Sequence, residues 1–459
     1  MGIGVYIEKT NLVFVYKIKY TEHINKEKEL KTMKNTTQEL LGFIATCTSP
    51  YHTVATSRKL LTDNGFAELK QADSWHLAPG GKYFTTVYDS TLLAFRIGAK
   101  ASTGLKIAAA HTDFPCFRIK PQAGILTEGY GTLNVEGYGG MIVSTWLDRP
   151  LPMAGKIVLK GKEPFSPKVQ LVDFKRPLFS MPNLAIHMNR EVNEGYKWNK
   201  QKDVLPLAAM FDRKSKDKEF FAEFLAKELK CKKEDILSYE LSTYPVETGC
   251  TFGLDNEFIS SPRLDNITSV KACLDGIIAS KAKAGLQIAA IFDNEEVGSK
   301  TKQGAGSNVL SQLLERIYGI LGKEREDVLR ELATGFMLSV DVAHALHPNY
   351  AEKCDPTNKP LMNSGLVLKQ AASQSYAGDA EAVGVVAGLC EEKKIPYQMY
   401  VNRSDIAGGS TLGSIASALV PIRTMDIGVP MLAMHSARET MGAKDQEALT
   451  ALLCAFFAK

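Results

Sequence analysis

The sequence has no apolar run that approaches the roughly 20 residues needed to cross a bilayer. It also has little excess charge: the formal net charge is +4 across 459 residues, and the basic residues form no dense patch. Neither a membrane partner nor a nucleic-acid partner is therefore expected. Internal repeats and low-complexity tracts are absent as well. What remains is the composition of an ordinary globular enzyme, with 45% hydrophobic and 23% charged residues.

Several catalytic motifs are also missing. The sequence contains no H-E-x-x-H, which excludes a helix-borne mononuclear zinc protease. Gly408-Gly409-Ser410 lacks the final glycine of a nucleophile elbow, and Gly298-Ser299-Lys300 lacks the Gly-Lys order of a Walker loop. Gly129-Tyr130-Gly131 lacks the third glycine of a dinucleotide-binding fingerprint.

The eight cysteines are scattered, and none forms a C-x-x-C pair. This spacing argues against a disulfide framework and against a thiolate zinc site. Several cysteines lie in apolar runs, so we expect buried free thiols in a reducing, cytoplasmic location. The cysteines are Cys47, Cys116, Cys231, Cys250, Cys273, Cys354, Cys390 and Cys454.

The length favours two domains, or one domain with a large insertion. Residues 1–32 read poorly as the start of a domain, and no small-residue cleavage site follows the β-prone residues 12–20, so a signal peptide is not expected. Two interpretations of this segment remain open. It is either an extension upstream of a natural start at Met33 or an extra edge strand.

Four apolar, β-prone runs end in side chains that can bind a metal or transfer a proton. The runs and the residues that follow them are 106–110 before His111 and Asp113, 287–292 before Glu295 and Glu296, 336–340 before Asp341 and His344, and 429–434 before His435. Helical patterns beginning at Asp265 and at Ser307 lie between them. Strands that alternate with helices predict an α/β domain with a mostly parallel core sheet, and ligands bind beyond the carboxyl ends of such strands.

Residues 122–250 differ from this pattern. They are rich in glycine and proline and contain short β-like pieces at 155–159 and 169–172, together with a charged segment at 213–233 that resembles an exposed helix. We interpret 122–250 as an inserted β-rich domain. The catalytic domain is then divided into 33–121 and 251–459.

Each candidate residue has an ordinary alternative when it is taken alone. His111-Thr112-Asp113 places an imidazole and a carboxylate on one side of a strand, where the carboxylate could fix the histidine tautomer, but most such tripeptides are only polar strand ends. In the adjacent pair Glu295 and Glu296, one carboxylate could bind metal while the other takes a proton from the attacking water; a solvated acidic loop is the alternative. The sequence does not separate these two roles.

Asp265 alone reads as a helix cap, and His435 alone reads as a core histidine in a structural network with Arg438 and Glu439. The residues Asp341, His344 and His347 are harder to dismiss, because clustered histidine and aspartate at a strand end are uncommon. Together the strand ends supply histidines and several carboxylates. That set suits a pair of zinc-like ions about 3.5–4 Å apart.

The motifs, taken in order along the chain, resemble the M18 family of metallo-aminopeptidases. The matching residues are His111-Thr112-Asp113, Tyr138-Gly139-Gly140, Trp146-Leu147-Asp148-Arg149, Leu184 to His187, Arg263-Leu264-Asp265-Asn266, Asp293 to Ser299, Asp341 to His344, and Met434 to Glu439. The resemblance covers nearly everything after Met33. It implies an α/β fold of the zinc-exopeptidase type, with the inserted domain mediating dimerisation within a large tetrahedral dodecamer.

The resemblance also implies the role of each site residue. Two divalent ions per subunit, zinc first, with cobalt or manganese possible, would be held by His111, Asp265, Glu296, Asp341 and His435, with Asp265 bridging. Glu295 would be the general base and Asp113 would orient His111. His187 would reach into the site of a neighbouring subunit, while His344 and Lys369 would contact a peptide with a free N-terminus.

One segment departs from the family pattern. Residues 369–376 differ from the asparagine-rich stretch of the acidic-specific enzymes, so the preferred N-terminal residue stays open. A two-metal deacylase or carboxypeptidase on the same fold is the alternative function. A catalytically silent assembly protein is the rival from another class, and it would require the loss of a ligand or of the base.

Overall fold

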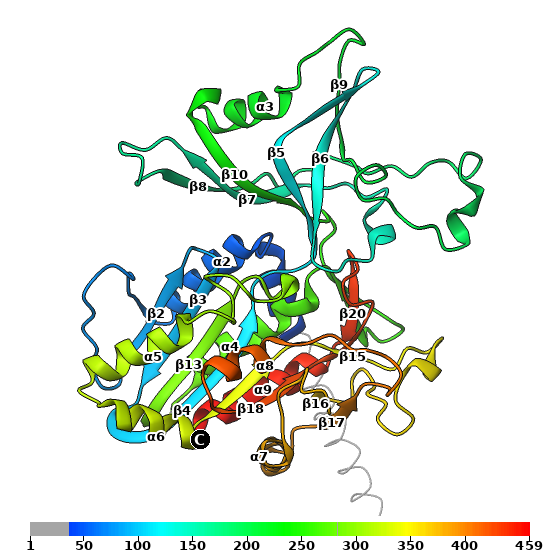
Figure 1. Ribbon diagram of the computed structural model, residues 1–459. Helices are drawn as coiled ribbons and strands as arrows, with labels where there is room; N and C mark the ends of the chain where they lie inside the picture. The colour runs from blue at the N-terminus through cyan, green and yellow to red at the C-terminus, as the bar shows by residue number, and fades with distance from the viewer. Residues whose placement is uncertain (1–35, 282) are drawn as a thin grey trace, which may run out of the picture.

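The computed structural model describes residues 36–281 and 283–459, and its largest element is a mixed sheet of nine strands (Figure 1). The predicted 1–32 extension lies outside the described residues. In spatial order the strands are β1 (Ala67–Glu68), β2 (Lys82–Val87), β3 (Thr91–Ile97), β13 (Ala284–Phe292), β4 (Lys100–His111), β14 (Phe336–Val340), β18 (Arg423–Gly428), β16 (Leu366–Gln370) and β17 (Tyr397–Val401). The central strands β13, β4, β14 and β18 run parallel to one another, as the strand–helix alternation predicts.

Helices cover both faces of this sheet. One face carries the helix at 36–46, α2 (Pro50–Asp63), α4 (Leu264–Ala279), α7 (Ala380–Lys393) and α9 (Asp445–Ala458); the other carries α5 (Val309–Ile320), α6 (Arg325–Thr334) and α8 (Leu412–Leu419). Strand β4 shows why both faces need cover. Ala108 and Ala110 pack into the core under α4 and α9, whereas Ile107 and Ala109 pack under α5 and α8. Alternate side chains of one strand point to opposite faces, so an all-apolar strand is buried on both.

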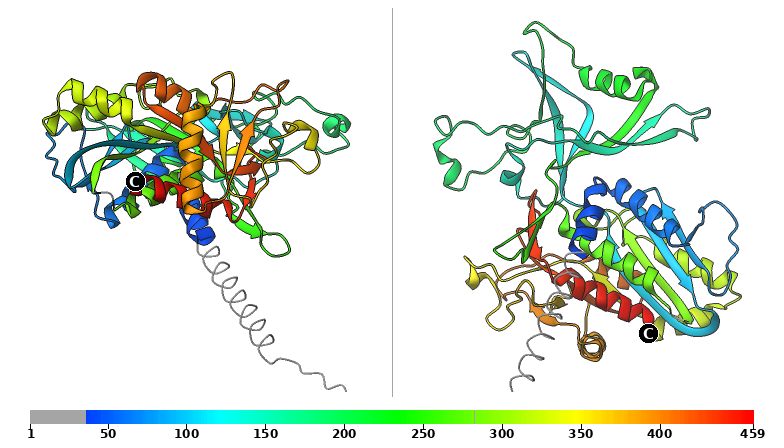
Figure 2. Two further views of the ribbon diagram at one scale, coloured as in Figure 1. Left: turned by 90° about the horizontal axis from the view of Figure 1, so that it is seen from below. Right: turned by 180° about the vertical axis from the view of Figure 1, so that it is seen from behind.

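A second sheet of six strands stands above the nine-stranded one and has its own helix (Figure 1). Its spatial order is β8 (Lys168–Asp173), β7 (Met153–Leu159), β10 (Ile236–Thr243), β5 (Cys116–Thr127), β6 (Tyr130–Tyr138) and β9 (Leu207–Met210), with α3 (Phe220–Leu229) packed against it. A separate hydrophobic core forms here around Phe117, Leu133 and Leu241. In the back view of Figure 2, the six-stranded sheet with α3 and the nine-stranded sheet with its helices form two separate bodies, connected where the chain passes from one to the other.

The prediction of an exposed helix at 213–233 is wrong in part. The helix is only Phe220–Leu229, and it buries Phe221 and Leu225 against the six-stranded sheet. The many charged residues on either side of Phe220–Leu229 made the whole segment resemble an exposed helix. Within it, the apolar residues recur at the spacing of a helix with one buried face.

A third, five-stranded sheet lies beside the nine-stranded one. Its order is β11 (Cys250–Phe252), β12 (Phe258–Ser261), β20 (Glu439–Gly442), β19 (Pro430–Leu432) and β15 (Ala343–His344). The run 429–434 was predicted to be a strand of the same sheet as the other three. It does contain a strand, β19, but this strand belongs to the five-stranded sheet. The chain leaves the nine-stranded sheet at Gly428, and β19 pairs with β15 and β20 instead. Pro430 has no N–H and so favours a short strand start over continuation of a ladder.

No helix within the described residues has both the length and the apolar character required to cross a membrane.

Candidate active site

Three neighbouring parallel strands deliver the first site residues to one edge of the nine-stranded sheet. His111 is the last residue of β4, Glu295 and Glu296 begin the short helix η4 (Glu295–Val297) just after β13, and Asp341 follows β14 directly. Asp265 is the second residue of α4. His435 arrives from the connection between β19 and β20, so a second sheet contributes to the same place.

Asp265 lies between the two histidines and belongs to two groups of possible metal ligands. In the first group, His111 Nε2 lies 3.4 Å from Asp265 Oδ1 and 3.6 Å from Asp341 Oδ1. In the second, His435 Nε2 lies 3.3 Å from Asp265 Oδ2 and 3.4 Å from Glu296 Oε2. Within each group the ligand atoms all lie within 4.8 Å of one another. One carboxylate therefore offers one oxygen to each group.

The chemistry of this donor set fits divalent cations. Asp265 Oδ1 and Glu296 Oε1 are buried without a hydrogen-bond donor, and unpaired buried carboxylate oxygens are costly unless a cation satisfies them. Burial, followed by the neighbouring Asp265 carboxylate, raises the pKa of Glu296 well above its usual range. For His435, burial alone would lower the pKa, but Asp265 and Glu296 raise it to about 10. Imidazole and carboxylate ligands of this kind suit zinc and similar ions.

Both histidines are held so that Nε2 faces the carboxylates. His111 Nδ1 lies 3.0 Å from the carbonyl oxygen of Asp113 and 3.3 Å from its Oδ1, while His435 Nδ1 donates to the carbonyl oxygen of Gly140 at 2.6 Å. Such an acceptor fixes the tautomer and the ring orientation of a metal-binding histidine. Asp113, expected only to orient His111, does more. Its two oxygens accept the backbone N–H groups of Glu295 and Glu296, each at 3.1 Å.

Glu439 makes the same kind of contact on the other side of the site, where the sequence indicated only a structural network with His435. Its carboxylate is 2% exposed and accepts the N–H groups of Asp265, at 3.1 Å, and of His435, at 2.8 Å. Burial and the nearby Asp265 raise the pKa of Glu439 to about 8. Only the proximity of Glu439 to His435 along the chain pointed to this role.

A cavity of about 290 Å³ opens above these groups. Glu295 lines it together with His111, Asp265, Asp341 and His435, whereas Glu296 is not part of its wall. This arrangement separates two adjacent glutamates that the sequence could not tell apart. Burial, opposed in part by His111, raises the pKa of Glu295 to about 8.

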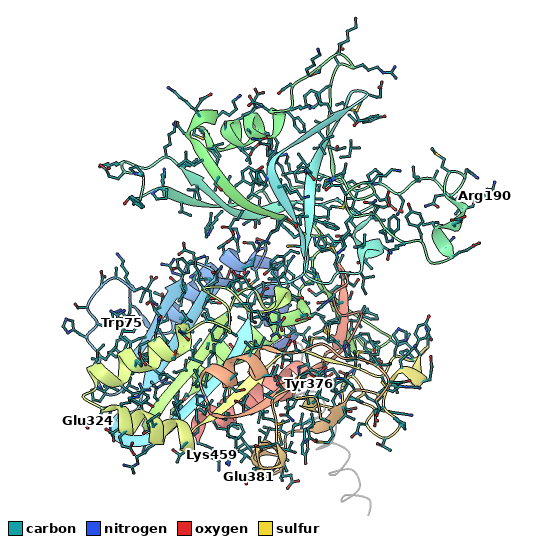
Figure 3. The ribbon with its side chains drawn as sticks, viewed as in Figure 1. Trp75, Arg190, Glu324, Tyr376, Glu381 and Lys459 are labelled. Carbon is teal, nitrogen blue, oxygen red and sulfur yellow. The ribbon has the colours of Figure 1, made fainter. Side chains whose placement is uncertain are left out.

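The predicted substrate-contacting residues divide into two sets. His344 and Lys369 both line the cavity, and Lys369 Nζ donates to the carbonyl oxygen of Val342 at 3.0 Å. His187 is exposed and does not line the cavity of its own chain. Figure 3 labels Arg190, three positions further on, at the outer end of a loop that projects from the six-stranded body.

The fold and the site define an α/β protein with a histidine–carboxylate centre at the strand ends, and the comparisons with known proteins give its family. The chain matches the family described as aminopeptidase I zinc metalloprotease (M18) over residues 43–457. A probable M18 family aminopeptidase 2 of Clostridium novyi is 46% identical over 89% of this chain and 95% of its own. Aspartyl aminopeptidase 4 of Saccharomyces cerevisiae is 38% identical over 94% of this chain and 97% of its own.

Solved structures agree. The chain resembles the protein in a structure of the Ape4 and Nbr1 complex with a TM-score of 0.88 at 32% identity, covering 93% of this chain and 86% of that one. It also resembles the S. cerevisiae mApe1 dodecamer structure, with a TM-score of 0.79 at 26% identity. The match covers 92% of this chain and 96% of that one. The chain belongs to the M18 family of zinc metalloproteases, and it is an aminopeptidase, an enzyme that hydrolyses peptide bonds.

Proposed function

We propose that the chain is a binuclear-metal aminopeptidase that removes the N-terminal residue from peptides, with Glu295 as the general base. The observation that carries this proposal is the position of Asp265, whose two oxygens face two separate ligand groups beside a cavity that Glu295 lines. A single-metal site would have no need of the second group.

The metal ligands in this proposal form two sets with one shared member. His111 and Asp341 would hold one ion and Glu296 and His435 the other, and Asp265, a member of both groups, would serve as the shared ligand. Zinc is the first candidate, with cobalt or manganese as alternatives, because the ligands are nitrogen and carboxylate oxygen without thiolate. When bound, the ions polarise the scissile carbonyl and lower the pKa of the attacking water.

Glu295 carries the proton. Its carboxylate lies 3.9 Å from His111 Nε2 and faces the cavity, so it is placed to take a proton from the attacking water and return it to the departing amine. Asp113 holds the Glu295 N–H and so fixes the backbone from which the base projects. His344 and Lys369 contact the substrate from the cavity wall.

A two-metal deacylase or carboxypeptidase on the same fold is the alternative. Peptides with a free α-amine are expected to be cleaved, and their N-acetylated counterparts to be cleaved at least about a hundredfold more slowly. A site that binds the free amine is left with unpaired polar groups when acetylation blocks that amine. Measuring kcat/KM for matched pairs of such peptides tests this. Faster cleavage of the acetylated member would favour the alternative. Varying the first residue of the free peptides also reads out the preferred N-terminal residue.

We further propose that the enzyme works as a homo-oligomer, a dodecamer built from dimers, in which the inserted domain 122–250 mediates dimerisation. The segment around His187 supports this, because it exposes apolar side chains that a partner surface would cover. These are Leu184, Ile186 and Met188, with exposed fractions of 58%, 47% and 73%. His187 would then enter the neighbouring site and stabilise the negative charge that develops on the carbonyl oxygen.

Mixing two inactive variants tests the shared site. His187→Ala and Glu295→Gln chains are expected to be inactive separately and to regain part of the wild-type rate when they are unfolded together and reassembled. Some sites would then combine an intact Glu295 with an intact His187 from the neighbour. Reassembly of each variant alone is the control, and a mixture that stays as inactive as its components contradicts the proposal.

We propose a cytoplasmic location. All eight cysteines are free in the described residues, as expected for a reducing compartment.

A further inference from the structure

The residues from the end of β6 onward contact the metal-ligand groups from the side of the six-stranded sheet. This stretch, residues 138–145, begins at Tyr138 and passes beside β20, where Figure 1 shows β5 and β6 reaching the junction between the two bodies. Its contacts reach three of the places from which ligands of the site project: the end of β4, the start of η4 and the connection between β19 and β20. The resemblance and the comparisons give these residues no role in the reaction.

Tyr138 fixes the carboxylate of Asp113. Its hydroxyl donates to Asp113 Oδ2 at 2.7 Å and accepts from Asn294 Nδ2 at 2.9 Å, and all three residues are buried. The guanidinium of Arg118 covers the tyrosine ring at 4.1 Å. Since Asp113 in turn holds His111 and the N–H groups of Glu295 and Glu296, one hydroxyl from the inserted sheet helps to set three site residues.

The two glycines that follow touch the second ligand group. Gly139 has φ +75° and lies so close to Glu296 that an added Cβ would stand 3.2 Å from the glutamate Cβ. The carbonyl oxygen of Gly140 accepts from His435 Nδ1 at 2.6 Å, which leaves His435 Nε2 facing Asp265 and Glu296. A side chain at position 139 would be strained at this positive φ and would press on the Glu296 side chain.

Two further bonds secure the segment that carries His435. The N–H of Ile142 donates to the carbonyl oxygen of His435 at 3.0 Å, and the N–H of Ala437 donates to Thr145 Oγ1 at 2.9 Å. Ala437 is also packed into the hydrophobic core of the six-stranded sheet. The second histidine is therefore held from both its ring and its backbone by the inserted body.

We infer that residues 138–145 are a positioning element through which the inserted sheet sets metal retention, with Tyr138 and Thr145 as positioning residues for the two ligand groups. The inference rests on the proposed binuclear site. It assigns the inserted body a part in metal binding that is separate from the proposed dimerisation. Residues that orient metal ligands from outside the coordination shell typically change metal affinity by about 10–100-fold when they are replaced.

The test measures zinc affinity by competition with a chromophoric chelator, using the full chain. Tyr138→Phe removes the hydroxyl and keeps the ring under Arg118; Thr145→Val removes the acceptor of the Ala437 N–H and keeps the side-chain shape. Both variants are expected to bind zinc about 10–100-fold more weakly than wild type while the metal-free protein keeps its fold, as measured by circular dichroism. Excess zinc should restore kcat with little change in KM, which a general packing defect would not allow.

Tyr239→Phe is the matched control. Its hydroxyl donates to the carbonyl oxygen of Lys120 at 2.7 Å within the same sheet, and its zinc affinity is expected to equal that of wild type. Suppose that Tyr138→Phe and Thr145→Val bind zinc with wild-type affinity while Asp265→Ala has lost binding. This result would overturn the inference about residues 138–145 and leave the proposed metal site standing. If Asp265→Ala retained wild-type zinc binding, the proposed site itself would fail and the inference with it. Should Tyr138→Phe not fold, Thr145→Val carries the test.

Discussion

Glu295→Gln is expected to lower kcat by about two to four orders of magnitude while the protein keeps its bound metal. The amide has nearly the same shape as the carboxylate but cannot accept the proton of the attacking water, and general-base catalysis typically contributes a factor in this range. Glu295 lines the cavity, whereas Glu296 packs against His435 beneath it, so the substitution leaves the proposed ligand set intact. Steady-state kinetics on an aminoacyl anilide, together with the metal content of the same sample, measures both effects.

Glu315→Gln provides the control, because this glutamate is an exposed residue of α5 and does not line the cavity that Glu295 lines. It should retain the wild-type rate. Substantial residual turnover in Glu295→Gln would remove the assignment of the base. Loss of metal from that variant would show that Glu295 is a ligand instead.

Asp265→Ala is expected to abolish binding of both ions and with it all activity. The two oxygens of Asp265 lie 3.4 Å from His111 Nε2 and 3.3 Å from His435 Nε2, so no other residue belongs to both ligand groups. Removing it takes one ligand from each group at once. His435→Ala, in contrast, takes a ligand from the second group only and should leave about one ion per chain.

Metal analysis after dialysis against a limiting zinc concentration distinguishes these outcomes. Asp255→Ala changes an exposed aspartate shortly before α4, and this variant is expected to bind as many ions as the wild-type chain. If Asp265→Ala and His435→Ala lost the same single ion, Asp265 would belong to one group alone and would not bridge.

The sequence predicts the site best where the site residues come after a buried strand. His111 and Asp341 come directly after an apolar run and Glu296 follows one a few residues later. Parallel neighbours place their carboxyl ends together, so residue patterns alone predict a cluster there. The family resemblance then gave the individual roles, which local patterns could not. Adjacent residues such as Glu295 and Glu296 have the same chemistry, and only their positions relative to the cavity separate them.

The remaining parts of the site depend on contacts between distant positions. Tyr138 meets Asp113 and Asn294 across two sheets, and Glu439 reaches Asp265 only because β20 pairs with β12 beside the start of α4. No local periodicity encodes such contacts. The strand predicted before His435 forms as β19 but joins another sheet for a related reason: an apolar run of that length suits either sheet, and the pairing partner decides which one it joins.

Zinc titration of the metal-free chain tests the central claim most directly. Enzyme stripped with a chelator and titrated with zinc is expected to take up two ions per chain, with peptidase activity appearing only as the second ion binds. Uptake of a single ion accompanied by full activity would contradict the binuclear site.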